Sequence, residues 1–418
     1  MSNPTLGLRE NLPQFILLVI VNAFVGGMIG LERTILPKIA EQEFSMAAGS
    51  AVLSFIVVFG IVKAITNYFT GRLANQVGKK NLLIIGWVLA LPVPLMLMYA
   101  PSWSWIVAAN VLLGIHQGLS WSTTVMMKID LVGEKQRGFA MGLNEFAGYL
   151  AVAIVAFLTG WVAGEYGVRP YPFYIGIVIA VAGLITTIAL VKDTRHHVEA
   201  EKSFSTVPRL KNVFADTTFR HNNLSSVTQA GLINNLNDGM VWGLLPVILA
   251  VKGFAIQDIG VIAAIYPGVW GISQLFTGKL ADIFCKKKLL FYGMMLQAAA
   301  LFAMVFAESY WAFASVSAVL GFGTAMVYPT FLASVSENTH PTDRPGSLGA
   351  FRFWRDLGYA IGALLTGFIT DWLGMNEAVV FIALLTLFSA VTIHFRMACA
   401  EATSFFGKKI DSCIPERT

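Results

Sequence analysis

A few charged and hydrogen-bonding side chains stand inside long apolar runs of this 418-residue chain. Asn234, Asn235 and Asp238 fall in one such run at spacing i, i+1 and i+4, so they share one face of a helix, and Trp242 extends the same stripe. A carboxylate between two amides can hold an ammonium group or a transferable proton. The alternative is a hydrogen-bond cluster that joins neighbouring helices. We predict a solute or proton site here.

A second polar stripe comprises Asn110, Gln117, Ser120, Trp121 and Thr124. His116 lies just beside it, and histidine is the side chain that titrates nearest to physiological pH. His116 is therefore a candidate carrier of a coupling proton. The alternative is a buried histidine that is simply hydrogen-bonded.

The first apolar run places Asn22 and Arg33 on one face, with Glu32 adjacent. We place Glu32 and Arg33 close to the outer boundary of the membrane. Arg33 can hold a carboxylate or phosphate group through two parallel hydrogen bonds. Alternatively, the two charges form an outer gate or extend to the membrane interface.

A further set of polar residues lies less than three helical turns inside the inner boundary. Its members are Lys63, Asn67, Glu145, Arg352, Arg355 and Asp356. Because each charge at mid-bilayer costs about 2.5–3.5 kcal/mol, it is retained only with a partner or a wet cavity. We favour gating over solute contact for this set.

The elements that must position these residues follow from composition. Hydrophobic residues make up 56% of the chain and charged residues only 13%, against about 25% charged in soluble proteins. This excludes a disordered chain and argues against a soluble enzyme. A membrane-spanning helix needs ~20 apolar residues. Twelve such runs lie near 14–36, 48–70, 81–100, 104–127, 139–163, 172–191, 224–250, 258–278, 288–307, 310–334, 347–371 and 377–396.

One long polar segment, 192–222, divides these runs into two sets of six. We therefore predict an N-terminal half (1–191), a cytoplasmic linker (192–222) and a C-terminal half with a short tail (223–418). Lys and Arg collect in alternate loops, at 71–80, 129–138, 192–222, 279–288 and 335–346. Since basic loops stay cytoplasmic, both termini are predicted inside, and the net charge of +5 reflects topology rather than nucleic-acid binding.

The two halves repeat each other. Gly71-Arg-Leu-Ala-Asn-Gln-Val-Gly-Lys-Lys80 recurs as Gly278-Lys-Leu-Ala-Asp-Ile-Phe-Cys-Lys-Lys287, at an offset of 207 residues. Arg137 and Arg344 stand at the same offset. Parallel repeats of six spans are typical of transporters that bind solute near the midplane.

These loops resemble the signature of the major facilitator superfamily, and the resemblance covers essentially the whole chain. Asn75 replaces the acidic residue usual in the first copy, whereas Asp282 keeps it in the second. Asn75 can still hydrogen-bond a neighbouring helix terminus. Asn110 stands where many members place an arginine associated with proton coupling. The resemblance implies a cavity between spans 1, 4, 7 and 10, to which span 10 adds Thr324 and Tyr328. It also implies that spans 2 and 11 face each other between the halves, which makes Lys63 and Asp356 a candidate gating pair.

No enzyme constellation is present in the sequence: H-E-x-x-H, a nucleophile elbow, a Walker-type loop and a dinucleotide fingerprint are all missing. The three cysteines, Cys285, Cys399 and Cys413, have a spacing that supports neither a disulfide framework nor a zinc or other metal site. We therefore predict no cofactor and a proton gradient as the driving force.

The sequence predicts an all-α protein with twelve transmembrane helices in two pseudo-symmetric halves, acting as a secondary active transporter by alternating access. The predicted cargo is a small polar or zwitterionic organic solute, taken up with protons. An efflux antiporter for drugs or metabolites is the first alternative, and a non-transporting receptor on the same fold is the second. We expect a monomer surrounded by lipid in a bacterial inner membrane.

Overall fold

The computed structural model describes residues 5–33, 35–46, 48–134, 136–203 and 205–399. Long helices fill both halves of the chain because the apolar runs have no water to bond their backbone groups and satisfy them internally. The N-terminal set is α1 (Leu12–Arg33), α2 (Leu36–Phe44), α3 (Ala48–Val77), α4 (Lys79–Ala90), α5 (Pro92–Met98), α6 (Trp103–Val132), α7 (Arg137–Tyr166) and α8 (Tyr171–Leu190). The C-terminal set is α11 (Asn222–Val251), α12 (Ile256–Ile283), α13 (Lys286–Val305), α14 (Tyr310–Glu337), α15 (Arg344–Trp372) and α16 (Met375–Arg396).

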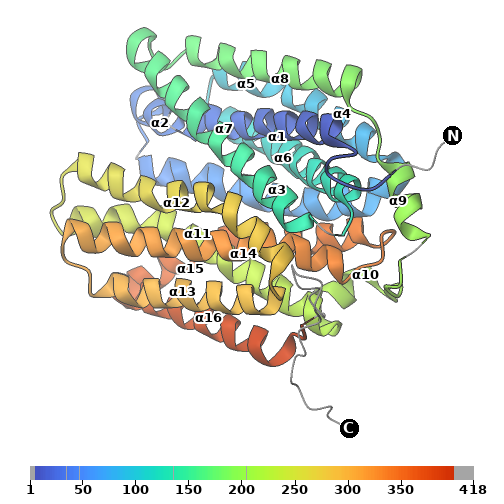
Figure 1. Cartoon of the computed structure of the whole chain (residues 1–418). Coiled ribbons are helices and arrows are strands. Elements are labelled where there is room, and N and C mark those ends of the chain that lie inside the picture. The colour runs from blue at the N-terminus through green and yellow to red at the C-terminus, as the bar shows by residue number, and fades with distance from the viewer. Residues whose placement is uncertain (1–4, 34, 47, 135, 204, 400–418) are drawn as a thin grey trace.

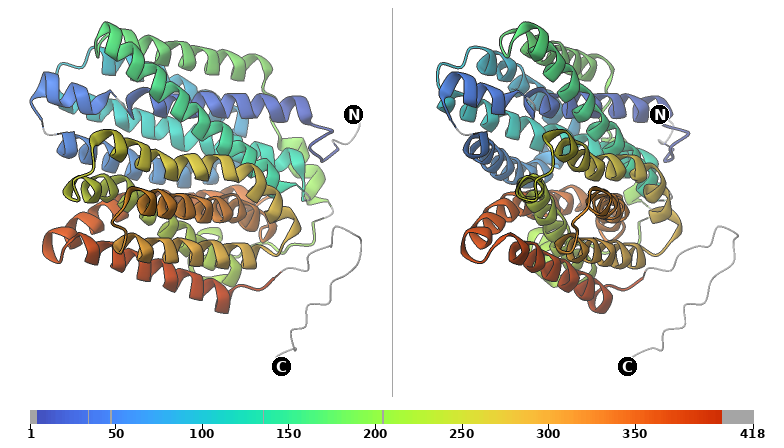
Figure 2. Two further views of the ribbon diagram at one scale, coloured as in Figure 1. Left: turned by 60° about the vertical axis from the view of Figure 1, so that its left-hand side comes forward. Right: turned by 90° about the vertical axis from the view of Figure 1, so that its left-hand side faces the viewer.

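The two sets lie side by side as two groups of roughly parallel rods, coloured blue to green and yellow-green to red (Figure 1), and both rotated views keep them apart (Figure 2). Between them in sequence come α9 (Arg195–Lys202), the short α10 (Val213–Ala215) and a π-helical turn at Asp216–Arg220. We call the end of the bundle formed by 191–221 and the turns at 77–79, 132–137, 284–286 and 338–343 the linker face. Each predicted span coincides with a long helix or a pair of helices, which confirms the predicted fold class.

Eight of the described helical segments are long and apolar enough to cross a membrane. The helices α3, α6, α11 and α15 are equally long but do not belong to these eight. They supply several of the buried charges of the interior, among them Lys128, Asp238 and Asp356, and α3 adds the partly buried Lys63. The least apolar spans therefore bring many of the polar groups into the bundle, and α1 and α7 add Glu32 and Glu145.

Several predicted boundaries are wrong. The segment 71–80 is mostly helix: α3 continues to Val77, and only Gly78, with φ +89°, turns the chain into α4. The positive φ is one that glycine adopts without strain. The first span does not end at 36, because Pro37 is tolerated in the first turn of α2 and helix resumes to Phe44. Glu32 and Arg33 are the last two residues of α1, and Lys38 lies in the first turn of α2.

Two helix pairs join the halves through backbone contact. A side chain added at Gly349 of α15 would meet the Gly71 Cα of α3 at 2.9 Å, and one at Gly278 of α12 would meet the Gly142 Cα of α7 at 3.0 Å. Gly71 and Gly278, like Gly142 and Gly349, are separated by the repeat offset of 207. The α3–α15 and α12–α7 contacts are thus equivalent under the repeat, and both lie toward the linker face.

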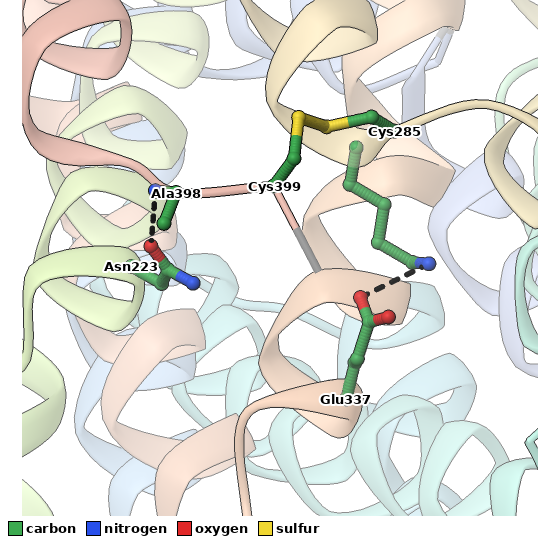
Figure 3. The surroundings of a disulfide bond; sticks show 6 residues. Asn223, Cys285, Glu337, Ala398 and Cys399 are labelled. Atoms are coloured by element: carbon green, nitrogen blue, oxygen red, sulfur yellow. Dashed lines mark hydrogen bonds and ion pairs between the residues drawn. A yellow bond between two sulfur atoms is a disulfide. The ribbon is translucent and has the colours of Figure 1, made fainter. Parts of the chain in front are cut away.

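The spacing of the cysteines gave no support for a disulfide, yet two of them form one. Cys285, in the turn before α13, is bonded to Cys399, just beyond α16 (Figure 3). The two residues are 114 positions apart, so their spacing carries no signal; they meet because α16 ends at the linker face. Cys413 lies outside the described residues.

Candidate functional site

A buried carboxylate on α15, Asp356, is the centre of a polar cluster between the halves. It accepts hydrogen bonds from Asn67 (2.6 Å) and Arg355 (2.7 Å), and the Lys63 ammonium lies 3.6 Å away. Asn235 of α11 reaches the same carboxylate at 3.5 Å. Since Lys63 and Asn67 come from α3, the predicted Lys63–Asp356 pair does connect the two halves.

A second buried pair lies at the repeat-equivalent positions Glu145 (α7) and Arg352 (α15), whose charged atoms are 3.6 Å apart. The Glu145 carboxylate also accepts hydrogen bonds from Trp121 (3.1 Å) and Asn144 (2.8 Å). Lys128 donates to Asn144 and to the Leu18 carbonyl oxygen (3.0 Å). Lys128 is completely buried because α6 continues past it to Val132.

Asp238 of α11 lies in a separate cluster inside the C-terminal half. The Tyr266 hydroxyl of α12 donates to its carboxylate, and the same hydroxyl lies 3.2 Å from the Thr324 hydroxyl of α14. Asn234 is buried, and neither polar atom of its side chain has a protein partner in the described part of the chain. The predicted stripe of α11 thus combines a hydrogen-bonded carboxylate with an amide left available. Trp242, at the other end of the stripe, is 46% exposed.

A row of aromatic rings crosses from one half to the other. Tyr149 of α7 lies between Trp121 (ring centroids 5.6 Å apart) and Trp270 of α12 (4.3 Å), and Trp270 also contacts Tyr328 of α14 (5.7 Å). The Arg355 guanidinium lies over the Tyr328 ring at 4.1 Å, a cation–π contact. The indole N–H of Trp270 is buried without a protein partner in the described part of the chain.

Tyr266 and Trp270 were not predicted from the sequence. The available signal was their i, i+4 spacing in an otherwise aliphatic run, which places both rings on one helix face. Gln274, one further turn along the same face, was also not predicted, and its buried side-chain amide has no partner among the described residues.

Toward the other end of the bundle from the linker face, α1 contributes Glu32 and Arg33. Glu32 is buried and hydrogen-bonded to Asn110, and one of its oxygens has no partner among the described residues. Arg33 hydrogen-bonds the Tyr359 hydroxyl of α15, which is a contact between the halves. Glu32 therefore binds within its own half, whereas Arg33 binds across to the other half.

Most of the remaining α6 stripe faces its own half. His116 lies against the Trp87 ring of α4 at 4.7 Å and contacts the Gly86 carbonyl oxygen (2.9 Å) and Ser120 (3.2 Å). Ser120 therefore points away from the predicted stripe, and the structure does not bring His116 to the interface between halves.

The other α6 residues bind α1. Gln117 donates to the Val25 carbonyl oxygen (2.7 Å), and Thr124 donates to Asn22 (2.8 Å). Asn22 in turn donates to the Asn144 carbonyl oxygen (2.9 Å). These bonds hold α1, α6 and α7 together.

At the linker face, Glu201 of α9 bridges the two repeat-related arginines. Arg344 at the start of α15 makes two parallel bonds to its carboxylate, at 2.8 and 2.6 Å, and Arg137 at the start of α7 binds the same carboxylate. Burial by itself would raise the pKa of Glu201, but the hydrogen bonds and charges of Arg344 and Arg137 hold that pKa below its usual value. The sequence offered no signal for this cluster, because α9 is a short polar segment without apolar periodicity.

The two signature loops make equivalent contacts with the opposite half. Asn75 donates to the Thr342 carbonyl oxygen (2.8 Å), two residues before α15, as expected for an amide at a helix terminus. Asp282 accepts from the backbone N–H groups of Gly138 (2.6 Å) and Phe139 (2.8 Å), in the first turn of α7. A carboxylate is favoured at that helix N-terminus. Together with Glu201, these contacts close the linker face between the halves.

Comparison with known proteins agrees with this architecture. The family model described as Major Facilitator Superfamily matches residues 15–225 and 227–403. Among curated proteins, the chain is 24% identical over 392 residues to the "Proton-coupled antiporter flippase LtaA" of Staphylococcus saprophyticus, covering 92% of this chain and 93% of that protein. It is 22% identical over 350 residues to the "Multidrug resistance protein MdtG" of Proteus mirabilis, covering 82% and 85%.

Solved structures share the fold at low sequence identity. The human organic anion transporter MFSD10 (TETRAN) superposes with a TM-score of 0.75 at 13% identity, covering 91% of this chain and 99% of that one. The E. coli fucose:proton symporter FucP superposes with a TM-score of 0.73 at 16% identity, covering 92% and 98%.

Proposed function

This chain belongs to the major facilitator superfamily, and from that premise we propose that it is a proton-coupled secondary transporter of a small polar or zwitterionic organic solute. The observation that carries the proposal is the set of buried, opposite charges and unpartnered polar atoms on helices of both halves. Such groups are costly in a membrane interior and are retained mainly along substrate and proton pathways.

The proposed solute class follows from two charged side chains near Tyr359, one basic and one acidic. The Tyr359 hydroxyl is bonded to Arg33 and lies within electrostatic range of Asp238. Arg33 can bind a carboxylate or phosphate group, and Asp238 can bind an ammonium group. Between the halves, the Trp270 N–H offers a donor on an aromatic surface. A compact solute that carries both signs of charge satisfies these groups together.

Asp238 is the candidate proton carrier. Its only protein donor within the described residues is the Tyr266 hydroxyl, and Arg355 and Asp356 act on it from a distance. A carboxylate with no cation in contact can take up and release a proton without breaking an ion pair. If solute binds differently beside protonated and ionised Asp238, the solute flux is coupled to the proton flux. His116 has a weaker claim because it lies against α4.

Antiport is the second candidate: the solute would then leave the cell as protons enter it. The relatives named as a proton-coupled antiporter flippase and a multidrug resistance protein favour it. The charged interior favours uptake of a polar solute over efflux of apolar drugs. In either case we expect a monomer in a bacterial inner membrane, with lipid around it, both termini cytoplasmic, and no cofactor beyond the gradient.

The test begins with a thermal-shift screen of the purified protein against metabolites, since a ligand that binds only the folded state raises the unfolding temperature. Hits are then assayed in proteoliposomes with an imposed pH gradient. Asp238→Asn should abolish proton-driven accumulation while solute exchange continues. Tyr266→Phe should weaken proton-driven accumulation.

Glu165→Gln, an exposed carboxylate at the end of α7, is the matched control and should behave as the unmodified protein. Proton-driven accumulation that survives in Asp238→Asn would overturn the assignment of this carboxylate. Export rather than import under an inward proton gradient would establish the antiporter, and binding without flux for every hit would establish a receptor.

A further inference from the structure

The end of α16 and the turn between α12 and α13 meet at the linker face, where they carry two of the three cysteines. Cys285 and Cys399 form a disulfide with their Cα atoms 5.7 Å apart (Figure 3). The Ala398 backbone N–H donates to the Asn223 side chain at 2.9 Å, which holds the chain just before Cys399 against the start of α11. The pairing therefore rests on two independent contacts of the same short segment.

The surroundings of Cys285 favour a reactive sulfur. Cys285 is the residue that precedes α13, and its carbonyl oxygen accepts the first hydrogen bond of that helix, from the Lys288 N–H at 3.0 Å. Three lysines follow it directly, of which Lys286 pairs with Glu337 of α14 at 3.0 Å. A helix N-terminus and adjacent cations both stabilise negative charge on a sulfur atom, and the thiolate is the nucleophilic form. Cys285 and Cys399 are both partly exposed, so a small oxidant can reach them.

The predicted position of this face determines what the bond means. The basic loops predict that the linker face is cytoplasmic. In that compartment thiols are kept reduced, and the disulfides that do form are mostly transient and redox-sensing. A permanent structural staple is therefore the less consistent interpretation.

We propose that Cys285 and Cys399 are a reversible oxidation site of this transporter, with hydrogen peroxide as the oxidant and small cytoplasmic thiols as the reductant. The Cys285 thiolate attacks peroxide to give a sulfenic acid and hydroxide. The Cys399 thiol then displaces water from that sulfur and forms the disulfide. Two thiols lose two electrons and two protons, and one peroxide becomes two waters. Exchange with two small thiols restores the reduced pair and releases their disulfide.

Oxidation acts on the contact between the halves through the turn that carries Cys285. Asp282, three residues earlier, holds the first turn of α7 through Gly138 and Phe139. Tethering Cys285 to Cys399 restricts the movement of this turn, because the far end of the tether is fixed to α11. The oxidised protein should therefore open its linker face more slowly than the reduced protein.

The experiment counts thiols, so it needs no substrate and its outcome is independent of the proposed transport function. Cys413→Ser removes the third cysteine and leaves the pair alone. The protein is treated with hydrogen peroxide, denatured and labelled with a maleimide-linked polyethylene glycol. Neither thiol should then be labelled, and treatment with dithiothreitol should restore the labelling of both. Cys285→Ser and Cys399→Ser, in the same background, should each keep one labelled thiol and form no bond within the chain.

The proposal is overturned if both thiols remain labelled after peroxide, or if the bond forms between two chains, seen as a dimer on a non-reducing gel. In a further test, free thiols are blocked with maleimide in intact cells grown without added oxidant. The proposal is also overturned if the pair is already fully oxidised in those cells, since the disulfide would then be permanent. As a second measurement, hydrogen exchange in the first turn of α7 should slow on oxidation. This slowing should be lost in Cys285→Ser.

Discussion

The buried carboxylate of Glu201 should control whether the linker face stays closed. Its side chain is 2% exposed, and those of Arg137 and Arg344 are 5% and 3% exposed. Glu201→Gln keeps the shape but removes the charge that the two guanidinium groups share. Breaking a buried ion pair in this way costs about 3–5 kcal/mol, because the remaining charges are left uncompensated.

The cost falls on the closed state alone, because water solvates both arginines once the halves separate. Since 1.4 kcal/mol is a factor of ten in an equilibrium constant, a loss of about 3 kcal/mol shifts the closed-to-open ratio by about 100-fold. The reporters are the backbone N–H groups of Gly138 and Phe139, which bind Asp282 in the closed state. Their hydrogen exchange, measured by mass spectrometry, should accelerate by up to that factor.

Glu199→Gln is the matched control, because Glu199 lies on the same helix, pairs with the exposed His196 and has a side chain that is 67% exposed. It should leave the exchange rates unchanged. Equal rates in Glu201→Gln and Glu199→Gln would refute the reasoning, because the buried cluster would then contribute nothing to closure.

The ionisation of Glu201 should make closure of the linker face depend on pH. Burial opposes ionisation of Glu201, but Arg344 and Arg137 hold the pKa of its carboxyl below the ordinary value of 4.5. A carboxyl whose pKa is lowered in the folded protein stabilises it fully above the ordinary value and loses that effect as pH falls through the lowered value. The difference between Glu201→Gln and the unmodified protein should therefore be constant at neutral pH and shrink only below pH 4.5.

Three further predictions concern the membrane interior. Lys63→Met and Asp356→Asn should be non-additive, with a coupling of about 0.5–3 kcal/mol in denaturant unfolding, because each removes the partner of the other; additive losses would show that the 3.6 Å pair is energetically irrelevant. Gly142→Ala should loosen the α7–α12 contact at a cost of about 1–3 kcal/mol, since its Cβ would lie 3.2 Å from the Gly278 Cα. Gly164→Ala on the same helix is the control, because its Cβ would meet nothing within 4 Å. Equal unfolding temperatures for the two variants would contradict this prediction. His116→Ala should lower the unfolding temperature but retain proton-driven accumulation, because the ring packs on α4; loss of coupling in a stable variant would restore His116 as a proton carrier.

Local patterns accounted for the architecture. Apolar runs long enough to cross a bilayer, a polar segment between them and a loop motif repeated 207 residues apart predicted the helices and the two halves. The same patterns identified Lys63, Asp356, Glu145 and Arg352 as groups in need of partners, because a charge in an apolar run is costly wherever it lies. That argument needs no knowledge of neighbouring helices.

The partners themselves depended on how each helix is rotated and how closely it packs. His116 and Trp121 are five residues apart on α6, yet one faces α4 and the other reaches Glu145 on α7. Trp270 belongs to the aromatic row only because α12 lies against both α7 and α14.

What the sequence determined by itself was the local free-energy balance: which segments enter a membrane, which end of each segment carries basic residues, and which buried charges require compensation. Only the tertiary structure decided that Glu201 joins Arg137 to Arg344 and that Cys285 meets Cys399, over separations of up to 143 residues. The physical reason is that hydrophobic periodicity acts within one helix. A hydrogen bond or a disulfide requires a few ångströms between segments whose relative position no local pattern specifies.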